Sequence, residues 1–256
     1  MTQMLAGKKG LVVGIANEHS IAWGCAKAFQ AEGAELAVTY LNLKAEPHVR
    51  PLAQQVGASV ILPLDVRDEA QMEAVFNAVN AKWGKLDFLL HAIAFAPKED
   101  LHGRVSDCSR QGFLTAMDIS CYSFIRMAHF AEPLMTAGGC LLTTSNYGGE
   151  RVVEHYNIMG PVKSALEGAV KYLAAELGKS RIRVNALSPG PILTRAAGGL
   201  ADFEELLREA ERRAPLHEMP LSADDVGAMA AFLVSDGARH ITGNVTFVDC
   251  GTHILG

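Results

Sequence analysis

Short apolar runs alternate with helical patterns along the whole chain of 256 residues, and this alternation limits the fold more than any other feature. The runs have the length of strands and are apolar on both faces, which is typical of a parallel sheet covered by helices on each side. No Pro/Ser-rich linker or internal repeat divides the chain. The sequence therefore predicts a single α/β domain over residues 1–256, with a doubly wound, Rossmann-type, seven-stranded parallel sheet flanked by helices.

The expected elements can be placed by residue number. Strands are expected at 11–16, 36–40, 60–64, 88–94, 140–145, 183–187 and 245–248. Helices are expected at 21–31, 69–83, 108–135, 156–177, 202–213 and 223–234. In such a sheet, ligands bind beyond the carboxyl ends of the strands, at the point where the strand order reverses. The loops that follow the strands are therefore the places to look for a site.

Charge and composition argue against several classes of protein. The formal net charge is -5, whereas a nucleic-acid-binding protein usually has a basic excess. No run approaches the roughly 20 apolar residues of a membrane span, and residues 1–10 lack the apolar stretch of a signal peptide. The five cysteines are scattered, without a C-x-x-C pair, so free thiols in the cytoplasm are expected rather than disulfides or a metal site.

The turn after the first strand has features of a phosphate-binding turn. Gly14 allows a sharp change of direction, and the free N–H groups at the start of the helix after Ser20 can hold a pyrophosphate. Gly24 is expected to let this helix approach the sheet. The glycines do not form the G-x-G-x-x-G pattern, so an ordinary strand–helix turn is the alternative interpretation.

The residues after the second strand indicate which nicotinamide cofactor is bound. An NAD site usually has an acidic residue there, and an NADP site has a cation for the extra phosphate. Leu41 cannot pair with a phosphate, Asn42 can bond a hydroxyl, and Lys44 can either reach a phosphate or remain solvated. This segment favours NADH, with NADPH as the alternative.

Tyr156 and Lys163 are the candidate chemical centre. They are seven residues apart, almost two helical turns, so both side chains can share one face of the helix expected at 156–177. The common Tyr-x-x-x-Lys spacing does not apply, because residue 160 is Gly. A tyrosine hydroxyl can donate to an oxygen that gains negative charge, and a lysine adds positive potential beside it.

Several motifs together resemble the bacterial-type enoyl-acyl carrier protein reductases, a divergent branch of the short-chain dehydrogenase/reductase superfamily. They are Gly14 followed by Ser20-Ile21-Ala22 and Gly24, and the segments 64–66, 91–97, 118–124, 156–160, 183–186 and 190–194. The resemblance covers essentially the whole chain. It implies reduction of trans-2-enoyl thioesters on acyl carrier protein with NADH in fatty acid synthesis, by a cytoplasmic homotetramer.

The same resemblance implies roles for particular residues. Tyr156 would donate to the thioester oxygen and Lys163 would bond the nicotinamide ribose. The residues implied in cofactor binding are Gly14, Ser20, Ile21, Leu41, Asp65, Val66, Ala92, Ile93, Ala94, Lys163, Ile192 and Thr194. The acyl-pocket candidates are Phe95, Met159, Ala196, Ala197 and Phe203, with residues 193–213 as a small helical substrate lid.

Some of these positions have a second interpretation or depart from the family. Asp65 can instead cap a helix, and His91 is expected to be a packed, hydrogen-bonded histidine. The family usually has a second tyrosine where this chain has Asn146, with Tyr147 next to it. Tyr147 can enter the site, Asn146 can donate from its amide, or Tyr147 can simply pack. Ala94 stands where the family commonly has glycine, and its methyl group can narrow the cofactor channel.

Two other functions compete with enoyl reduction. One is a different reductase of the same superfamily, acting on a carbonyl or another enone; the long Tyr156–Lys163 spacing argues against the common ketoreductases. The other is a nicotinamide-binding sensor or scaffold with little turnover, which the departures at Ala94 and Asn146 would suit.

Overall fold

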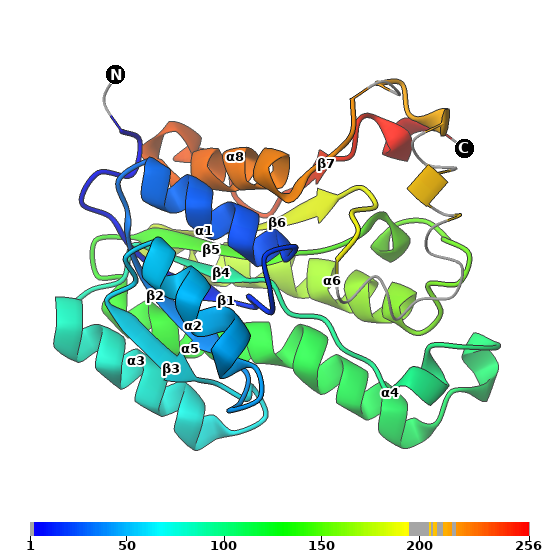
Figure 1. Cartoon of the computed structure of the whole chain (residues 1–256), viewed down its shortest axis with the longest axis horizontal. Helices are drawn as coiled ribbons and strands as arrows, with labels where there is room; N and C mark the ends of the chain where they lie inside the picture. Colours follow the sequence, from blue (N-terminus) through cyan, green and yellow to red (C-terminus); the bar gives the residue numbers. More distant parts are fainter. Residues whose placement is uncertain (1–2, 195–204, 206, 209–211, 217–218, 256) are drawn as a thin grey trace.

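All seven strands lie in one parallel sheet, in the order β3-β2-β1-β4-β5-β6-β7 (Figure 1). The structure, a computed structural model, describes residues 3–194, 205, 207–208, 212–216 and 219–255. The strands are β1 (Lys9–Val13), β2 (Glu35–Tyr40), β3 (Val60–Pro63), β4 (Phe88–His91), β5 (Gly139–Thr144), β6 (Ile182–Pro189) and β7 (Val245–Val248). The prediction of a single domain with a seven-stranded parallel sheet is confirmed.

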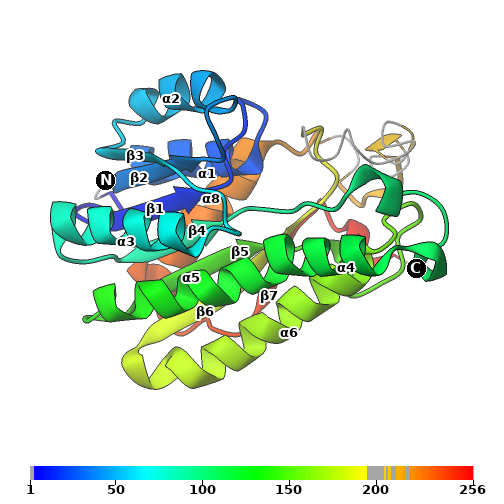
Figure 2. The same ribbon diagram turned by 90° about the horizontal axis from the view of Figure 1, so that it is seen from below.

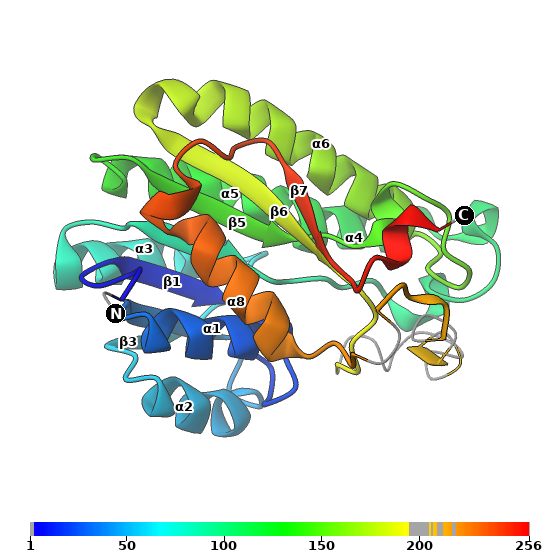
Figure 3. The ribbon, with the colours of Figure 1, turned by 90° about the horizontal axis from the view of Figure 1, so that it is seen from above.

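Helices cover both faces of the sheet. They are α1 (Ile21–Ala31), α2 (Glu46–Gln55), α3 (Glu69–Trp83), α4 (Arg110–Met117), α5 (Ser123–Ala131), α6 (Met159–Leu177) and α8 (Ala223–Val234). One layer contains α3, α5 and α6, seen from below in Figure 2. The other contains α1, α2 and α8, seen from above in Figure 3. In the described part of the chain, no helix is both long and apolar enough to cross a membrane.

The order of the strands places the ligand-binding edge between β1 and β4. β1 pairs with β2 on one side and with β4 on the other, with Val13 opposite His91. Gly14 then turns with φ 118°, and a Cβ there would lie 2.1 Å from the carbonyl oxygen of Ala92. The sharp turn expected at Gly14 is confirmed, because any larger residue would push the ends of β1 and β4 apart.

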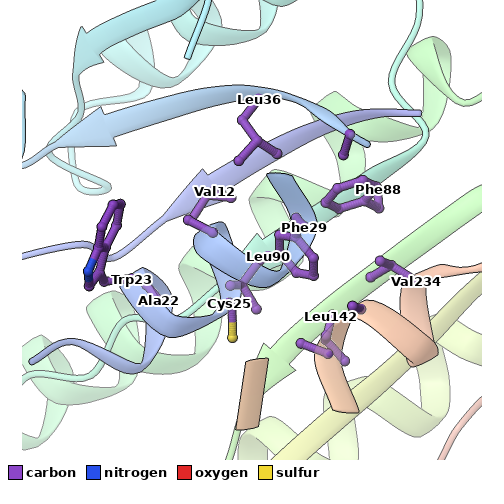
Figure 4. Close-up of a cluster of buried hydrophobic side chains, with 14 of the residues drawn as sticks. Val12, Ala22, Trp23, Cys25, Phe29, Leu36, Phe88, Leu90, Leu142 and Val234 are labelled. Atoms are coloured by element: carbon purple, nitrogen blue, oxygen red, sulfur yellow. The ribbon is translucent and has the colours of Figure 1, made fainter. Parts of the chain in front are cut away.

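The closest helix packing joins α1 to α8. A Cβ at Gly24 would lie 2.1 Å from the carbonyl oxygen of Ala223, and one at Gly227 would lie 2.4 Å from that of Gly24. The prediction that Gly24 brings its helix to the sheet is therefore wrong: it brings α1 to α8. The paired helices then bury Phe29 and Val234 in the core above the sheet (Figure 4).

Two elements differ from the sequence prediction. The helix expected at 108–135 forms as a continuous helical run from Arg110, but it contains a π-helical turn, Asp118–Tyr122, between α4 and α5. α2 was not predicted, because Pro47 and Pro51 interrupt a helical pattern. It forms because Val49, Leu52 and Ala53 are buried against the sheet. The helix expected at 202–213 falls mostly outside the described residues.

Candidate active site

Tyr156 lies in the turn between β5 and α6, at the carboxyl edge of the sheet. The helix begins at Met159, so the prediction that Tyr156 and Lys163 share one helical face is wrong. His155 and Asn157 have φ values of 61° and 48°, in the left-handed region. A residue in that conformation cannot continue a right-handed helix, which is why the helix starts only after it.

The ring of Tyr156 packs closely against its surroundings. A Cβ at Gly148 would lie 2.4 Å from Cδ1 of the ring, and the ring also contacts the apolar cluster at the start of α6 that includes Ile158 and Met159. Burial, and to a smaller extent the charge of Glu167, raise the pKa of Tyr156 above its ordinary value. The hydroxyl therefore stays protonated at neutral pH and can act as a hydrogen-bond donor.

Lys163 is buried on the first turns of α6. Its side chain is only 2% exposed, and its Nζ donates to the carbonyl oxygen of Thr144, at the end of β5, at 2.7 Å. Burial lowers the pKa of Lys163 to about 8. An ammonium group has three donors, so two remain for a ligand. Gly149 packs against Lys163, as its neighbour Gly148 packs against Tyr156: a Cβ at Gly149 would lie 3.1 Å from Cβ of Lys163.

Glu167 and Ser145 are polar residues near this pair that the sequence analysis missed. Glu167 follows Lys163 by one helical turn and accepts a hydrogen bond from the Ser145 hydroxyl, directly after β5. Burial raises the pKa of Glu167. A carboxylate one turn after a buried lysine, with a serine at the end of a strand, is the sequence signal that would have found them.

The structure separates the alternatives for Asn146 and Tyr147. The side-chain oxygen of Asn146 accepts from the N–H of Gly148 at 2.8 Å and so shapes the turn. The ring of Tyr147 lies edge-on to Phe247, with 6.3 Å between ring centroids, and Phe247 stacks on His253 at 4.0 Å. Tyr147 thus packs against β7, and its entry into the site stays a prediction. An amide contact from Asn146 to a substrate stays a prediction.

In the turn before α1, some backbone N–H groups bond within the turn, whereas others have no partner in it. The Ser20 hydroxyl oxygen accepts from the N–H groups of Ala16 and Asn17, at 3.0 and 3.1 Å. This closes the turn from within. The N–H groups of Ile21 and Ala22 precede the first helical hydrogen bonds and point from the positive end of α1. The turn therefore fits a pyrophosphate, held by these two donors.

The residues after β2 fit a ribose without an extra phosphate. Leu41 is 55% exposed. The side-chain oxygen of Asn42 accepts from the N–H groups of Lys44 and Ala45, so it is used within the turn. Within residues 40–44, the exposed Lys44 is the one cation.

Asp65 has a different role from a helix cap. Its carboxylate pairs with Arg67, at 2.6 and 3.0 Å, and this pairing lowers the pKa of Asp65. Asp68 caps α3 by accepting from the N–H groups of Ala70 and Gln71. The helix-cap interpretation of Asp65 is therefore wrong. The half-buried Asp65 and Val66 follow β3, at the same edge of the sheet as Gly14.

The strand before the predicted cofactor channel ends earlier than expected, at His91. His91 is fully buried and bonds the hydroxyl oxygens of Thr143 and Ser123, at 3.0 and 2.8 Å. Burial lowers the pKa of His91 to about 3, so it is neutral and structural. The prediction of a packed, hydrogen-bonded histidine is confirmed.

The loop after β4 runs along the edge of the site. Ala92 and Ile93 are half-buried, whereas Ala94 and Phe95 are exposed. The backbone of Phe95 is held by Ser120 of the π-helical turn, whose hydroxyl accepts from the Phe95 N–H at 2.9 Å and donates to its carbonyl at 3.1 Å. The π-helical turn between α4 and α5 thus holds the loop that was predicted to line the cofactor channel.

The remaining predicted residues lie on the substrate side. Ile192 is half-buried against the core under α1 and α8, and Thr194 is half-buried near it. Met159 is 5% exposed at the start of α6, and Pro161 is in the first turn of that helix, where proline is tolerated. Ala196, Ala197 and Phe203, and most of the lid expected at 193–213, lie outside the described residues.

Comparison with known proteins identifies the family. A family model described as Enoyl-(Acyl carrier protein) reductase matches residues 14–253, nearly the full length. The chain belongs to this family. The enoyl reductases similar to it include an enoyl-[acyl-carrier-protein] reductase [NADH] of Rhizobium meliloti, 48% identical over 99% of this chain and 93% of the relative. A relative of the same name from a Nostoc species is 46% identical over 98% of both chains.

Solved enoyl reductase structures have the same fold. The enzyme of Anaplasma phagocytophilum, in complex with NAD, is 48% identical and aligns with a TM-score of 0.95, over 100% of this chain and 97% of that one. The enzyme of Bacillus cereus, with NADP+ and an indole naphthyridinone, is 46% identical, with a TM-score of 0.96 over 99% of both chains. The overall arrangement in Figure 1 is therefore that of the family.

Proposed function

We propose that the protein reduces trans-2-enoyl thioesters carried by acyl carrier protein, with NADH as the reductant, in fatty acid synthesis. One observation carries the proposal. Tyr156, a hydrogen-bond donor at neutral pH, and Lys163, a buried amine, are both contacted by neighbouring glycines of a single turn at the ligand-binding edge of the sheet. The family membership of the chain agrees with this chemistry.

The chain's own groups suit this reaction. When bound, NADH would supply the hydride that adds to the β-carbon of the thioester, and the proton that completes the product at the α-carbon would come ultimately from solvent. Negative charge then develops on the thioester oxygen, and the hydroxyl of Tyr156 donates a hydrogen bond to it. Because this bond strengthens as the charge grows, it stabilises the transition state more than the ground state. Lys163 holds the nicotinamide ribose with donors that Thr144 leaves free.

The cofactor would lie across the edge between β1 and β4. Gly14, Ser20 and Ile21 would hold the pyrophosphate, and Leu41 the adenosine ribose. The remaining contacts are assigned to Asp65, Val66, Ala92, Ile93, Ala94, Ile192 and Thr194. The exposed apolar Leu41 offers nothing to a 2′-phosphate, which supports NADH over NADPH.

The acyl chain would pass between Phe95 and Met159, under a lid formed by residues 193–213 that includes Ala196, Ala197 and Phe203. We also propose a homotetramer located in the cytoplasm, with substrates delivered on acyl carrier protein. Light scattering coupled to size-exclusion chromatography measures the mass of the assembly, and a mass below four chains contradicts the tetramer. Fractionation of the producing cells checks the location.

One assay tests the reaction. Purified protein is mixed with a crotonyl or longer enoyl thioester and NADH, and the absorbance of the reduced nicotinamide is followed. We expect NADH oxidation that depends on the enoyl substrate. Oxidation with ketoacyl but not enoyl thioesters would instead select a carbonyl reductase. Cofactor binding without oxidation of either NADH or NADPH would select the sensor or scaffold.

A further inference from the structure

The turn that carries Tyr156 has an unusual backbone. His155 and Asn157, on either side of the tyrosine, both have φ values in the left-handed region, at 61° and 48°. Residues other than glycine adopt this region at an energetic cost, although asparagine tolerates it better than most. Such a backbone persists only where surrounding contacts hold it, and residues of this kind gather at functional sites.

One of those contacts comes from the side chain of Asn157. Its Nδ2 donates to the carbonyl oxygen of Gly103 at 3.0 Å, across 54 positions of sequence. Gly103 lies in the connection between β4 and α4, and it too has a positive φ, of 85°. The hydrogen bond therefore ties the turn before α6 to a loop from a different part of the chain.

The loop around Gly103 is itself well fixed. The carboxylate of Asp100 is buried, and it accepts from the N–H of Ser109 at 2.6 Å and from its hydroxyl at 3.1 Å. Leu101 packs against the same apolar cluster as Tyr156. Gly103 itself is exposed, so the bond from Asn157 joins the turn to a loop that is held two and three positions earlier, at Leu101 and Asp100.

The side-chain oxygen of Asn157 indicates how the amide group is oriented. Oδ1 is buried and has no hydrogen-bond partner among the described residues. If the amide were turned over, this oxygen would face the carbonyl oxygen of Gly103, and two acceptors would meet. The donor role of Nδ2 is therefore the arrangement that the surroundings favour.

We infer that Asn157 is a positioning residue for the reaction: its hydrogen bond to Gly103 holds the hydroxyl of Tyr156 where it can donate to the thioester oxygen as that oxygen gains negative charge. The inference rests on the proposed function, in which Tyr156 donates to that oxygen. Gly148, in the turn after β5, contacts the ring of Tyr156. The bond between Asn157 and Gly103 holds the backbone next to Tyr156. Asn157 touches neither cofactor nor substrate in this role.

Two substitutions distinguish the effect of the Asn157 side chain from that of its backbone conformation. Asn157→Gly keeps the left-handed conformation and removes the donor, whereas Asn157→Ala removes the donor and also disfavours the conformation. A displacement of about 1 Å at a reacting group can cost roughly 100-fold in rate, so we expect kcat to fall about 10-fold for the Gly variant and further for the Ala variant. The dissociation constant for NADH should not change.

Repeating Asn157→Gly in a Tyr156→Phe background tests whether Asn157 acts through the tyrosine. We expect no further loss of kcat there, because the hydroxyl that Asn157 positions is already gone. A further loss of the same factor as in the native background would overturn the inference, as would a native kcat for Asn157→Gly. If Asn157→Ala does not fold, Asn157→Gly alone decides the test.

His155→Gly is the matched control, because His155 has the same backbone conformation but an exposed side chain. We expect it to keep kcat within about twofold of the native value, as for most surface substitutions. An equal loss in this control would show that the backbone alone is responsible, and the inference would fail. If Tyr156→Phe itself keeps native activity, the proposed function of Tyr156 fails instead, which is a distinguishable result.

Discussion

Tyr156 is half-buried and Lys163 is buried, and the removal of water has opposite consequences for the two. It favours the neutral form of each group. For Tyr156 the neutral form is the hydrogen-bond donor; this form already prevails at physiological pH, and burial extends its range to higher pH. For Lys163 the neutral form has lost its positive charge, so burial brings the loss of that charge close to neutral pH.

The tyrosine can be tested by removing its hydroxyl alone. Tyr156→Phe should lower kcat by about 100- to 1000-fold, the usual effect of losing one donor to a developing oxyanion, and leave NADH affinity nearly unchanged. Steady-state kinetics with an enoyl thioester and fluorescence titration with NADH measure the two quantities. Tyr147→Phe is the matched control, since the Tyr147 ring packs against Phe247. A similar loss in both variants would contradict the assigned role.

The lysine should make cofactor binding depend on pH. The pKa of Lys163 is lowered to about 8, so its cationic form prevails below that pH and is lost above it. We expect NADH affinity to weaken as the pH rises through about 8, measured by fluorescence titration. Lys163→Met should bind NADH weakly with little dependence on pH in this range. Lys171→Met, an exposed lysine of the same helix, should behave as the native protein. Affinity independent of pH in the native protein would contradict this role.

At this scale, the residue types of the site were predictable but their local geometry was not. Residue chemistry and the family resemblance selected Tyr156 and Lys163 as candidates, whereas the helical-spacing argument failed because α6 begins only at Met159. The left-handed residues beside Tyr156 were not visible, because a tolerant residue such as Asn157 also occurs in many other conformations. The turn at Asn146 had a usable signal: an asparagine two residues before a glycine, after a strand, commonly accepts from that backbone N–H.

Among the elements, the contact between α1 and α8 makes the strongest demand on sequence. Gly24→Ala would place a Cβ 2.1 Å from the carbonyl oxygen of Ala223, so the helices would have to separate. We expect the free energy of unfolding to fall by about 1–3 kcal/mol, as for other overpacked sites. Chemical denaturation with urea measures the change.

Gly168 provides the matched control for this substitution. It lies within α6, and a Cβ there would meet no atom within 4 Å. Gly168→Ala should therefore stabilise the protein, by up to about 1 kcal/mol, because alanine favours the helix. Destabilisation of similar size in both variants would show that the close approach of the helices is not the cause.

Periodicity predicted most elements, and tertiary contacts decided the rest. The strands were readable because each is a short run of mostly apolar residues, and most of them are buried on both faces. α2 was missed because two prolines argue against a helix locally, although burial of one of its faces outweighs that cost. The π-helical turn was missed because its contacts are distant in sequence: the Ser120 hydroxyl accepts from the N–H of Phe95 and donates to its carbonyl.

For the whole molecule, the proposed cofactor preference can be measured as stability. A ligand at about 100 times its dissociation constant adds about 2.7 kcal/mol, which corresponds to roughly 5–10 °C in Tm for a chain of this size. We expect NADH to raise Tm more than NADPH at equal concentration. Leu41→Arg, which adds a cation after β2, should reduce the difference between the Tm shifts caused by NADH and NADPH. Leu43→Arg, at an exposed position two residues on, is the control. A larger shift with NADPH for the native protein would contradict the preference.

The pairing of α1 with α8 also has a consequence for how the protein is made. During synthesis α1 leaves the ribosome early, whereas α8 belongs to the last part of the chain. At roughly 5–20 residues per second, the apolar face of α1 must wait on the order of ten seconds or more for its partner. In that interval the nascent chain exposes the surface around Gly24 to chaperones and to other unfinished chains. The final core can therefore close only after α8 has left the ribosome.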